Sequence, residues 1–456
     1  MQTNFTAEQL QKTTNEEADR ILRKCVHCGL CTATCPTYVV LGDERDSPRG
    51  RIYAIKDMLE GGAAARQEVS VHVDRCLSCF SCMTTCPSGV DYMHLVEIAR
   101  THIEKTGRRS LKDRLVRRAL AAIVPYPRRF RMALKLAPLG KSLAEPMRRL
   151  GLHELAAMTE LAPREGVRRA RFAGPGTAST KAERKGRVIL LAGCAQQVLR
   201  PEINDATIRL LARGGVDVIV SQGSGCCGAL PQHIGRDDEA IEFAKRNVEA
   251  WAKTMAKGDI DAIIINASGC GTTVKDYGHL LAHNLTYAVA ARQIAAVTKD
   301  ITEYLTTQDI GAPKRWSSLK VAYHPACSLQ HGQRVTQQPK TLLKKAGFTL
   351  VDIPESHLCC GSAGVYNILQ PKIARELRDR KAAKIKALRP DIVATGNIGC
   401  ITQLQAALET PVVHTVELLD WAYGGPTPRG LEGFAKYSTA APQPTSRRTA
   451  EDYIAS

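Results

Sequence analysis

Apolar and polar positions follow the same order twice in the second half of the chain. Each copy has three short apolar runs of strand length, separated by two amphipathic stretches of helix length. In the first copy we predict strands at 187–192, 216–220 and 261–266 and helices at 202–213 and 238–256. In the second copy we predict strands at 320–324, 349–353 and 391–395 and helices at 340–346 and 372–388. Because strands that alternate with helices are typical of parallel sheets, the sequence predicts an α/β fold built from a duplicated unit.

The other parts of the chain have different patterns. Strand signals are sparse before about residue 105, and a weakly helical stretch at 52–59 lies between two cysteine-rich segments. Several prolines divide the basic segment after it into short helices, and the residues from Gly424 onward are rich in Pro, Ser, Thr and Gly. We therefore expect a mainly helical domain at 1–105, a basic linker with helices at 106–185, α/β domains at 186–312 and 313–423, and a disordered tail at 424–456.

The 16 cysteines form four groups of four, with none left over. In each N-terminal group, two residues lie between the first and second cysteines and two between the second and third. Three residues lie between the third and fourth cysteines, and a proline follows the fourth. In each C-terminal group, the first cysteine is 32 positions before a Cys-Cys-Gly sequence, and a Gly-Cys pair comes later. The groups are Cys25, Cys28, Cys31 and Cys35; Cys76, Cys79, Cys82 and Cys86; Cys194, Cys226, Cys227 and Cys270; and Cys327, Cys359, Cys360 and Cys400.

The N-terminal spacing is that of bacterial ferredoxins, in which four thiolates hold each 4Fe–4S cluster. Three closely spaced cysteines wrap one face of a cluster, and the proline turns the chain away. In two-cluster proteins the fourth cysteine of each run ligates the other cluster. We therefore assign Cys25, Cys28, Cys31 and Cys86 to one 4Fe–4S cluster, and Cys76, Cys79, Cys82 and Cys35 to a second. Structural zinc is the alternative, and two complete copies of the motif with both prolines argue against it.

The C-terminal cysteines come directly after predicted strands. Ligands of open α/β sheets bind at the carboxyl ends of the strands, so these cysteines should meet at one rim. Adjacent thiols that occur twice favour a metal or a third cluster, and the duplication suggests one site shared by both repeats. Buried structural thiols or redox thiols are the alternative. Gly223, Gly225 and Gly228 match a dinucleotide-binding pattern, but the second repeat lacks the first two glycines, so the cysteines define the motif.

Positive charge is concentrated in the middle of the chain. The net charge is +18, and the segment 105–187 holds 22 Lys and Arg against 6 Asp and Glu. The stretch 111–136 mixes basic residues with Leu, Ala, Ile and Met, a pattern that suits a partner subunit or an anionic membrane surface. An iron–sulfur regulator that binds nucleic acid is a further hypothesis from charge alone. Because the sequence has no recognisable helix-turn-helix or aromatic-rich surface, we expect no nucleic acid as a partner.

The sequence also indicates the cellular compartment of the protein and its contact with membranes. No apolar run approaches the roughly 18 residues needed to span a bilayer. Residues 1–5 lack the basic-then-apolar pattern of a secretion signal. Because cytosolic thiols stay reduced, clustered cysteines there favour metal binding over disulfides. We therefore expect a cytoplasmic protein whose only membrane contact would be peripheral, at the cytoplasmic face of the inner membrane.

Five segments resemble the iron–sulfur subunits of bacterial glycolate oxidase (glycolate dehydrogenase). They are 25–29 (CVHCG), 31–38 (CTATCPTY), 47–53 (SPRGRIY), 267–271 (ASGCG) and 356–364 (SHLCCGSAG), and the likeness extends from about residue 16 to 423. The architecture is also similar to lactate-utilisation iron–sulfur proteins, the C subunit of anaerobic glycerol-3-phosphate dehydrogenase and heterodisulfide reductase subunits. The wording of the five segments favours glycolate.

The resemblance implies an electron-transfer subunit. FAD-containing partner subunits would oxidise glycolate to glyoxylate, and electrons would pass through this chain to a quinone-type acceptor. The sequence has no convincing flavin or nicotinamide site and no acid–base constellation, so we assign no catalytic residue to it. A stand-alone reductase that uses the Cys-Cys-Gly site is the other hypothesis.

The end of each Cys-Cys-Gly unit limits the resemblance, and the histidines need a separate interpretation. Heterodisulfide reductase relatives end each Cys-Cys-Gly unit in Cys-x2-Cys, whereas Thr273 and Gln403 stand at that spacing here. His27, His324 and His414 are interpreted as packing or surface residues rather than catalytic bases. Among them His324, three positions before Cys327, is the outside candidate for an extra ligand.

Overall fold

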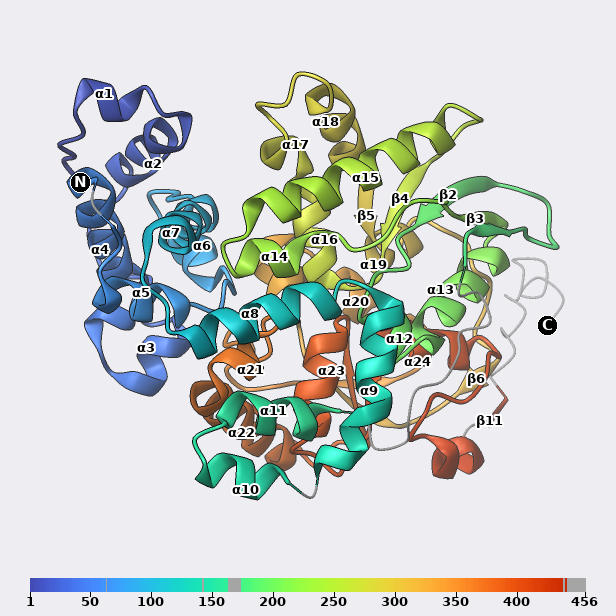
Figure 1. The fold of residues 1–456 in the computed structure, drawn as a ribbon. Coiled ribbons are helices and arrows are strands. Elements are labelled where there is room, and N and C mark those ends of the chain that lie inside the picture. Colours follow the sequence, from blue (N-terminus) through green and yellow to red (C-terminus); the bar gives the residue numbers. More distant parts are fainter. Residues whose placement is uncertain (63, 142, 163–173, 438, 441–456) are drawn as a thin grey trace, which may run out of the picture.

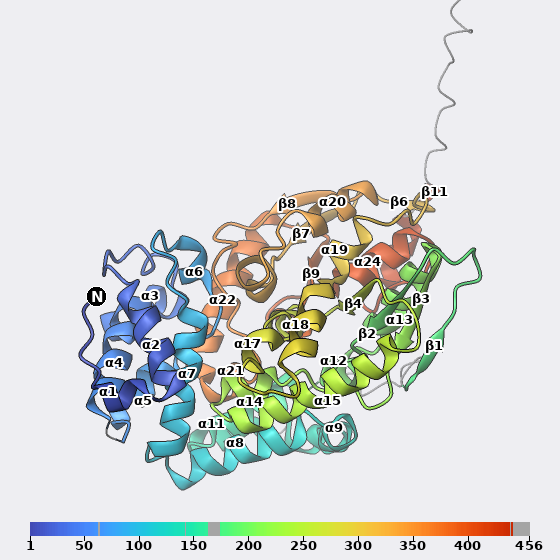
Figure 2. The same ribbon diagram turned by 90° about the horizontal axis from the view of Figure 1, so that it is seen from above.

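The computed structural model describes residues 1–456 except 63, 142, 163–173, 438 and 441–456. Figure 1 shows a group of N-terminal helices (blue) beside two α/β units, one green to yellow and one orange to red. Seen from above in Figure 2, the helical group forms one end of an elongated body, and further helices run along one long side. The predicted fold class, a helical N-terminal domain followed by a duplicated α/β unit, is confirmed.

Short helices make up the N-terminal part. They are α1 (Ala7–Leu10), α2 (Thr13–Arg23), α3 (Pro36–Leu41), the 3₁₀ helix η1 (Glu44–Asp46), α4 (Pro48–Gly61), α5 (Gln67–Asp74), α6 (Ser81–Thr85) and α7 (Tyr92–Thr106). Ile21, Ile55 and Leu95 are fully buried in their common core. Pro36 stands in the first turn of α3, where a missing N–H costs nothing, so the proline after the first cysteine run starts a helix.

The first α/β unit contains one mostly parallel sheet. Its elements are β1 (Gly176–Ala178), β2 (Gly186–Leu190), α12 (Gln196–Leu199), α13 (Glu202–Arg213), β3 (Val216–Val220), α14 (Ala229–His233), α15 (Asp237–Met255), β4 (Ala262–Ile265), α16 (Ser268–Lys275), α17 (Tyr277–Leu280), α18 (Ala288–Val297), β5 (Thr298–Asp300) and α19 (Ile301–Leu305). The strand order is β1-β3-β2-β4-β5, and only β1 runs antiparallel to its neighbour.

The second unit repeats this plan. Its elements are β6 (Arg315–Trp316), β7 (Lys320–Tyr323), η2 (Ser328–Gly332), α20 (Gln338–Lys345), β8 (Thr349–Asp352), α21 (Tyr366–Leu369), α22 (Pro371–Leu388), β9 (Ile392–Thr395), α23 (Ile398–Gln405), β10 (Val412–His414) and α24 (Thr415–Ala422). Its parallel order β8-β7-β9-β10 matches β3-β2-β4-β5 of the first unit. The three predicted strands of each unit are confirmed, whereas β1, β5 and β10 were not predicted.

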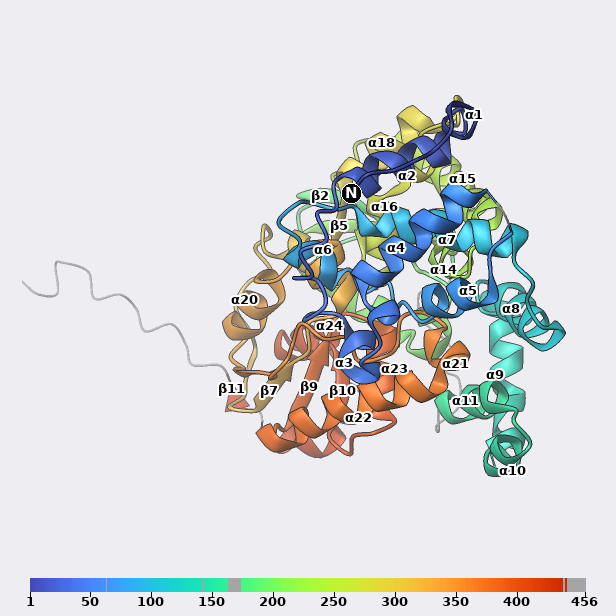
Figure 3. The same cartoon turned by 90° about the vertical axis from the view of Figure 1, so that its left-hand side faces the viewer.

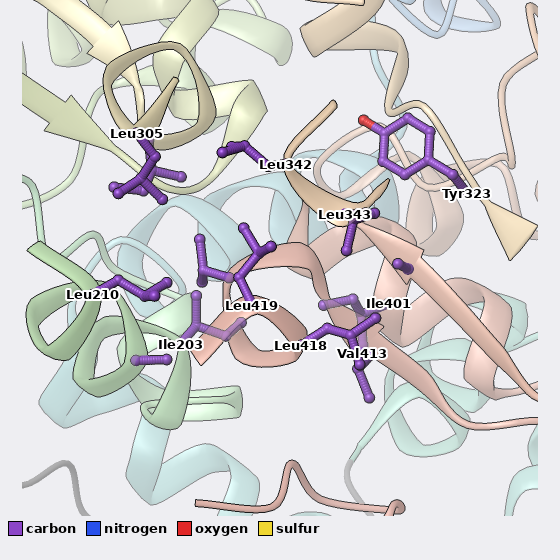
Figure 4. Close-up of a cluster of buried hydrophobic side chains, with 14 of the residues drawn as sticks. Ile203, Leu210, Leu305, Tyr323, Leu342, Leu343, Ile401, Val413, Leu418 and Leu419 are labelled. Carbon is purple, nitrogen blue, oxygen red and sulfur yellow. The ribbon is translucent and has the colours of Figure 1, made fainter. Parts of the chain in front are cut away.

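The two units share one hydrophobic core. Figure 4 shows Leu210 of α13 and Leu305 of α19 from the first unit facing Leu342 of α20 and Leu419 of α24 from the second. All four side chains are nearly or fully buried. At about 25 cal/mol for each Å² of buried apolar surface, such a joint core fixes the units against each other. The two cysteine-bearing rims are therefore held in a defined relation.

The basic middle segment is folded onto the rest of the molecule. It forms α8 (Leu111–Ile123), α9 (Pro127–Lys141), α10 (Ala144–Arg149) and α11 (His153–Leu161). Leu120 of α8 packs with Leu230 of α14 and with Val365, so one helix contacts both units. Arg117 Nη2 also lies 3.0 Å from Asp74 Oδ2 of α5. The segment predicted as a linker thus connects the domains through packing, because α8 contacts the N-terminal helices and both α/β units.

The beginning of the predicted disordered tail is ordered. Leu431 is fully buried in the shared core, and Arg315 Nη1 donates a hydrogen bond of 2.7 Å to the Gly425 carbonyl. The 3₁₀ helix η3 (Glu432–Tyr437) follows, and β11 (Thr439–Ala440) pairs with β6. The prediction of disorder therefore does not hold at 424–437 and 439–440, since one buried leucine anchors a polar segment; residue 438 and the remainder, 441–456, lie outside the described residues. Among the helices that the structure describes, none has the length and apolar character needed to cross a membrane.

Candidate metal-binding cysteine sites

Five cysteines from both N-terminal runs line one cavity near the surface, and four of them are the predicted ligands of the first cluster. Cys25, Cys28 and Cys31 come from the loop between α2 and α3, and Cys86 follows α6. Burial, together with the nearby thiols of Cys25, Cys86 and Cys35, raises the pKa of Cys31 to about 11. Cys28 is exposed, so this cavity opens toward solvent. The structure therefore brings the fourth cysteine of the second run to the first three of the first run.

A second cavity gathers the reciprocal set. It is lined by Cys35 from the end of the first run and by Cys76, Cys79 and Cys82 from the second. Burial raises the pKa of Cys79 and of Cys82 well above the usual thiol value, and neighbouring thiols add to the effect. Cys82 lines both cavities, so the two sites adjoin.

The same backbone turn builds both sites. His27 and Gly29 of the first run have positive φ, at 55° and 81°, and Ser78 and Phe80 of the second run have φ of 48° and 60°. These residues occupy equivalent places between the cysteines. Left-handed conformations are costly for residues other than glycine, and such strain persists only where the surroundings impose it. The paired turns curl each loop so that its three thiols point inward.

A polar shell that sequence analysis missed surrounds the second cavity. Arg51 is buried, and its Nη1 lies 3.9 Å from Cys35 Sγ. The Thr37 hydroxyl is 3.2 Å from the same sulfur, and Tyr92 Oη donates to Cys76 Sγ at 3.8 Å. The Ser78 N–H also points to Cys76 Sγ, at 3.4 Å. The only signal in the sequence is an arginine on the apolar face of the helix at 48–61.

In the first α/β unit, the four cysteines meet at the carboxyl ends of three strands. Cys194 follows β2, the pair Cys226 and Cys227 follows β3, and Cys270 lies in α16 after β4. A hydrogen bond with Cys226 and burial together raise the pKa of Cys194 well above its usual value. Cys227 hydrogen-bonds with both Cys226 and Cys270, and its pKa is also raised well above the usual value. The predicted rim position is therefore confirmed for this repeat.

The second unit repeats the arrangement with one additional group. Cys327 follows β7, the pair Cys359 and Cys360 follows β8, and Cys400 lies in α23 after β9. Contact with Cys360 and with the His324 imidazole lowers the pKa of Cys400 to about 6. The thiols thus gather by repeat into two groups of four. The prediction of one site shared by both repeats stays a prediction, and Ser268 of α16 lies 2.8 Å from Ser328 of η2, between the two groups.

A glycine fixes the Cys-Cys turn in each unit. Gly228 and Gly361 have φ of 92° and 87°, and their N–H groups lie 3.5 and 3.4 Å from the sulfur two residues earlier. A Cβ on Gly361 would stand 2.5 Å from the Ala374 carbonyl oxygen, and one on Gly228 would stand 2.9 Å from that of Ala240. The glycine of each Cys-Cys-Gly sequence is therefore required by a left-handed turn packed against a helix.

The cysteine group of the second unit borders the second N-terminal cavity. Cys359 and Cys327 interact electrostatically with Cys79, and both pack with Leu77 in one small buried cluster. Tyr366 Oη donates a hydrogen bond of 2.9 Å to the Arg75 carbonyl, which joins the second unit to the N-terminal helices at this border. Figure 3 shows the N-terminal helices in front of both units, with α3 beside α22. Three groups of thiols therefore adjoin one another in space, from the surface at Cys28 to the interior of the second unit.

The donor sets fit thiolate-ligated iron. All 16 cysteines are free, so the converging thiols are not disulfides. Several buried thiols with raised pKa values in one cavity repel one another when ionised, and a bound cationic centre removes that cost. Soft thiolate ligands select iron–sulfur clusters and zinc over hard cations.

Comparison with protein families agrees with this chemistry. Residues 21–90 match the model of the 4Fe–4S dicluster domain, and residues 188–275 and 321–405 each match the model of the CCG cysteine-rich domain. The fold and the cysteine sites therefore define an iron–sulfur protein with a dicluster domain and two cysteine-rich domains.

Individual relatives identify the family. The chain is 42% identical to the glycolate oxidase iron–sulfur subunit of Escherichia coli (strain K12), over 92% of this chain and 99% of that protein. It is 30% identical to the probable glycolate oxidase iron–sulfur subunit of Bacillus subtilis (strain 168), with the same coverage. The chain belongs to the family of glycolate oxidase iron–sulfur subunits.

More distant similarities are shorter or weaker. Lactate utilization protein A of Bacillus velezensis is 24% identical over 51% of this chain and 99% of that protein. The crystal structure of a hypothetical protein from Helicobacter pylori superposes with a TM-score of 0.52 at 10% identity, covering 91% of this chain and 73% of that one. This last likeness shows a related fold.

Proposed function

We propose that this chain is the electron-transfer subunit of a glycolate-oxidising complex. It takes electrons from an FAD-containing partner subunit and delivers them to a quinone-type acceptor. The substrate class follows from the relative that is 42% identical over nearly the whole chain and is named as a glycolate oxidase subunit. In the N-terminal domain, Cys25, Cys28, Cys31 and Cys86 hold one 4Fe–4S cluster, and Cys76, Cys79, Cys82 and Cys35 hold another. Such a cluster supplies one-electron redox chemistry at a fixed position.

The observation that carries the proposal is the unbroken series of cysteine groups. Cys28 is exposed, Cys82 lines both N-terminal cavities, and Cys79 lies against Cys359 of the second unit. A storage or structural role for the metal does not require adjoining sites. A series that begins at the surface and ends in another domain suits passage of charge through the protein.

The residues around the cysteine sites influence the reduction potentials of the clusters. Hydrogen bonds to the ligating sulfurs, burial and nearby charge are the means by which a protein sets a cluster potential. Around the second cavity, Arg51 and Tyr92 lie within hydrogen-bond distance of the sulfurs, whereas Arg49 at the first cavity interacts with Cys31 through its charge alone among the described contacts. We infer that the second cavity favours the reduced state more than the first, which directs electrons inward.

The surface around Cys28 is the proposed contact with the FAD-containing subunit. Val26 and Leu30, on either side of Cys28, are 67% and 55% exposed, and Tyr53 is 55% exposed nearby. Large apolar side chains in the open next to a redox site are typical of a surface that a partner covers. A partner docked here excludes water from the shortest route into the chain.

The outer face of the basic helices is the proposed contact with an anionic membrane. Leu111 and Leu115 of α8 and Leu136 of α9 are 75%, 65% and 66% exposed, and Arg114 and Arg118 lie exposed among them. Basic residues interleaved with exposed leucines suit the headgroup region of anionic lipid. Helix α11 of the same segment packs against α21 and α22 of the second unit, so this face lies on the side where the thiol series ends. An acidic face of a partner subunit is the other occupant that this charge would suit.

An anaerobic pull-down tests the proposal. The tagged full-length chain should retain an FAD-containing protein, and the complex should reduce a dye when glycolate is added. Lactate and glycerol 3-phosphate, supplied in the same assay, test the alternative substrates. A Cys28→Ser variant should still retain the partner but lose most dye reduction. Isolation of the chain alone, from an extract without glycolate-dependent activity, would contradict the proposal.

A further inference from the structure

His324 is a fully buried histidine whose ring contacts the Cys400 thiol and makes no hydrogen bond to a nitrogen or oxygen atom of the described residues. It follows β7 directly, it is 0% exposed, and both ring nitrogens lack a hydrogen-bond partner. Its backbone is fixed, because its N–H donates a 2.8 Å hydrogen bond to the Ala394 carbonyl of β9. By contrast, the buried His414 uses both nitrogens, accepting from the Val416 N–H at 3.1 Å and lying 2.8 Å from the Asn266 carbonyl oxygen. Leaving buried ring nitrogens without a hydrogen bond is destabilising, so a bound ligand would explain the position of this imidazole.

The ring faces the thiols of its own repeat. One ring nitrogen of His324 and the sulfurs of Cys360 and Cys400 all lie within 4.8 Å of one another, and all three residues are buried. Cys327 and Cys359 complete the same thiol group. Neutral imidazole and thiolate are the usual protein ligands of iron and zinc. The second unit therefore presents five converging donors.

The first unit provides an internal comparison because it has the same backbone and a different side chain. Leu191 stands three positions before Cys194, as His324 stands before Cys327. Its N–H donates a 3.1 Å hydrogen bond to the Ile264 carbonyl of β4, which is the bond that His324 makes to β9. The leucine packs with Cys227 and Cys270 in an apolar cluster. The duplicated scaffold thus offers an imidazole at one site and a hydrocarbon at the other.

We propose that His324 ligates iron, through a ring nitrogen, in an iron–sulfur centre that the second unit holds together with its four cysteines, and that the first unit offers thiolates alone. The inference rests on the proposed function, since it takes the second cysteine group as part of the electron path. The imidazole adds a neutral donor to the four thiolates, so the second unit has a ligand that the first unit lacks. The asymmetry distinguishes the second unit, at the border with Cys79, from the first.

Pulsed electron paramagnetic resonance of the reduced full-length chain, purified anaerobically, tests the assignment. With histidine alone labelled with ¹⁵N, the wild-type chain should show a strong ¹⁵N hyperfine coupling typical of a metal-bound imidazole. A His324→Leu variant, which copies Leu191, should lose this coupling and keep the signals of the N-terminal clusters. His331 of η2 provides the matched control, because it lies near Cys359 but hydrogen-bonds to Thr84 at 2.8 Å. A His331→Gln variant should keep the coupling.

The outcomes separate this inference from the proposed function. An iron-loaded wild-type chain without the coupling would overturn the inference, whether or not any variant folds. Retention of the coupling in His324→Leu, or its loss in His331→Gln alone, would overturn it as well. A His324→Cys variant should place a fifth thiolate at this position, lose the nitrogen coupling and shift one reduction potential downward. Glycolate-dependent reduction of the N-terminal clusters is measured separately, in the complex with the FAD-containing subunit, and its failure would count against the proposed function alone.

Discussion

Arg51 Nη1 lies 3.9 Å from Cys35 Sγ in the interior of the N-terminal helices. The guanidinium is balanced by Asp46, whose Oδ1 is 3.3 Å from Nη2, and Arg51 Nε donates to the His72 carbonyl at 2.6 Å. Arg51 and Asp46 are almost completely buried. A fixed positive charge beside a ligating sulfur favours an added electron on the ligated group. The pair therefore links the packing of α4 to the redox properties of the second cavity.

Replacing Arg51 should lower the potential of one cluster. We expect Arg51→Met to shift it downward by on the order of 100 mV, since a unit charge at this distance is worth a few kcal/mol at an effective dielectric constant near 20. Arg51→Lys should shift it much less because the charge remains. Redox titration followed by electron paramagnetic resonance measures both shifts. Because removing one partner of a buried pair is destabilising, the double variant Arg51→Met, Asp46→Asn controls for folding. An unchanged potential in Arg51→Met would contradict this role.

The two Cys-Cys-Gly sites should differ in their effect on electron delivery. Cys359 borders Cys79, whereas Cys226 contacts the cysteines of the first unit. We expect Cys359→Ser to lower the rate of quinone reduction at least tenfold, while glycolate still reduces the N-terminal clusters. Cys226→Ser, the matched change in the first repeat, should lower it less. Stopped-flow spectroscopy of the anaerobic complex measures both steps. Equal losses in the two variants would show that the border with Cys79 has no special role.

Exposed leucines of the basic helices should determine membrane binding. We expect Leu115→Glu with Leu136→Glu to weaken binding to vesicles that contain anionic lipid by about tenfold or more, because two apolar contacts are lost and two negative charges are added. Leu285→Glu is the control, since Leu285 is 100% exposed outside this segment. Co-sedimentation at low and high salt provides the measurement, and binding should fall as salt screens the charges. If wild-type chain ignores anionic vesicles but the double variant loses its partner subunit, the surface is a protein contact.

His94 should make the contact between the N-terminal helices and the first unit dependent on pH. Burial opposes its charge, yet hydrogen bonds to Asp276 and Asp91 raise the pKa of His94 to about 10 from a usual 6.5. The stabilisation is therefore complete below about pH 6.5, declines as the pH rises and is lost above about pH 10. We expect His94→Gln to lower the melting temperature by several degrees at pH 6.5, and the difference from wild type to vanish by about pH 10. A difference that is constant with pH would contradict the charged state of His94.

Much of the α/β architecture could be predicted because its signals are local and repeated. The helix at 202–213 was predicted with the bounds of α13, since an amphipathic stretch there ends at two glycines. The short strands β5 and β10 were missed, because each has three residues and is defined by pairing with β4 or β9. Three residues carry no periodicity, so only the tertiary neighbour reveals such a strand.

The grouping of the N-terminal cysteines was predicted, whereas the residues around them were missed. Cysteine spacing alone predicts which thiols gather, but nothing local in the sequence indicates that Arg51 turns inward or that Cys79 meets Cys359. The cysteines of each repeat gather at the strand ends of their own sheet, and the single site expected to be shared by both repeats stays a prediction. Contacts between segments hundreds of residues apart, such as Tyr366 with Arg75, depend on how the units pack.

The most direct test of the account is whether glycolate reduces iron–sulfur clusters held by the eight N-terminal cysteines. The anaerobic complex should be mixed with glycolate, frozen within one turnover and examined by electron paramagnetic resonance alongside iron and sulfide analysis. We predict signals of reduced 4Fe–4S clusters that appear at least as fast as the acceptor is reduced and that are altered in Cys28→Ser. Turnover of glycolate without such signals, or a chain that holds zinc in place of iron and sulfide, would contradict the account.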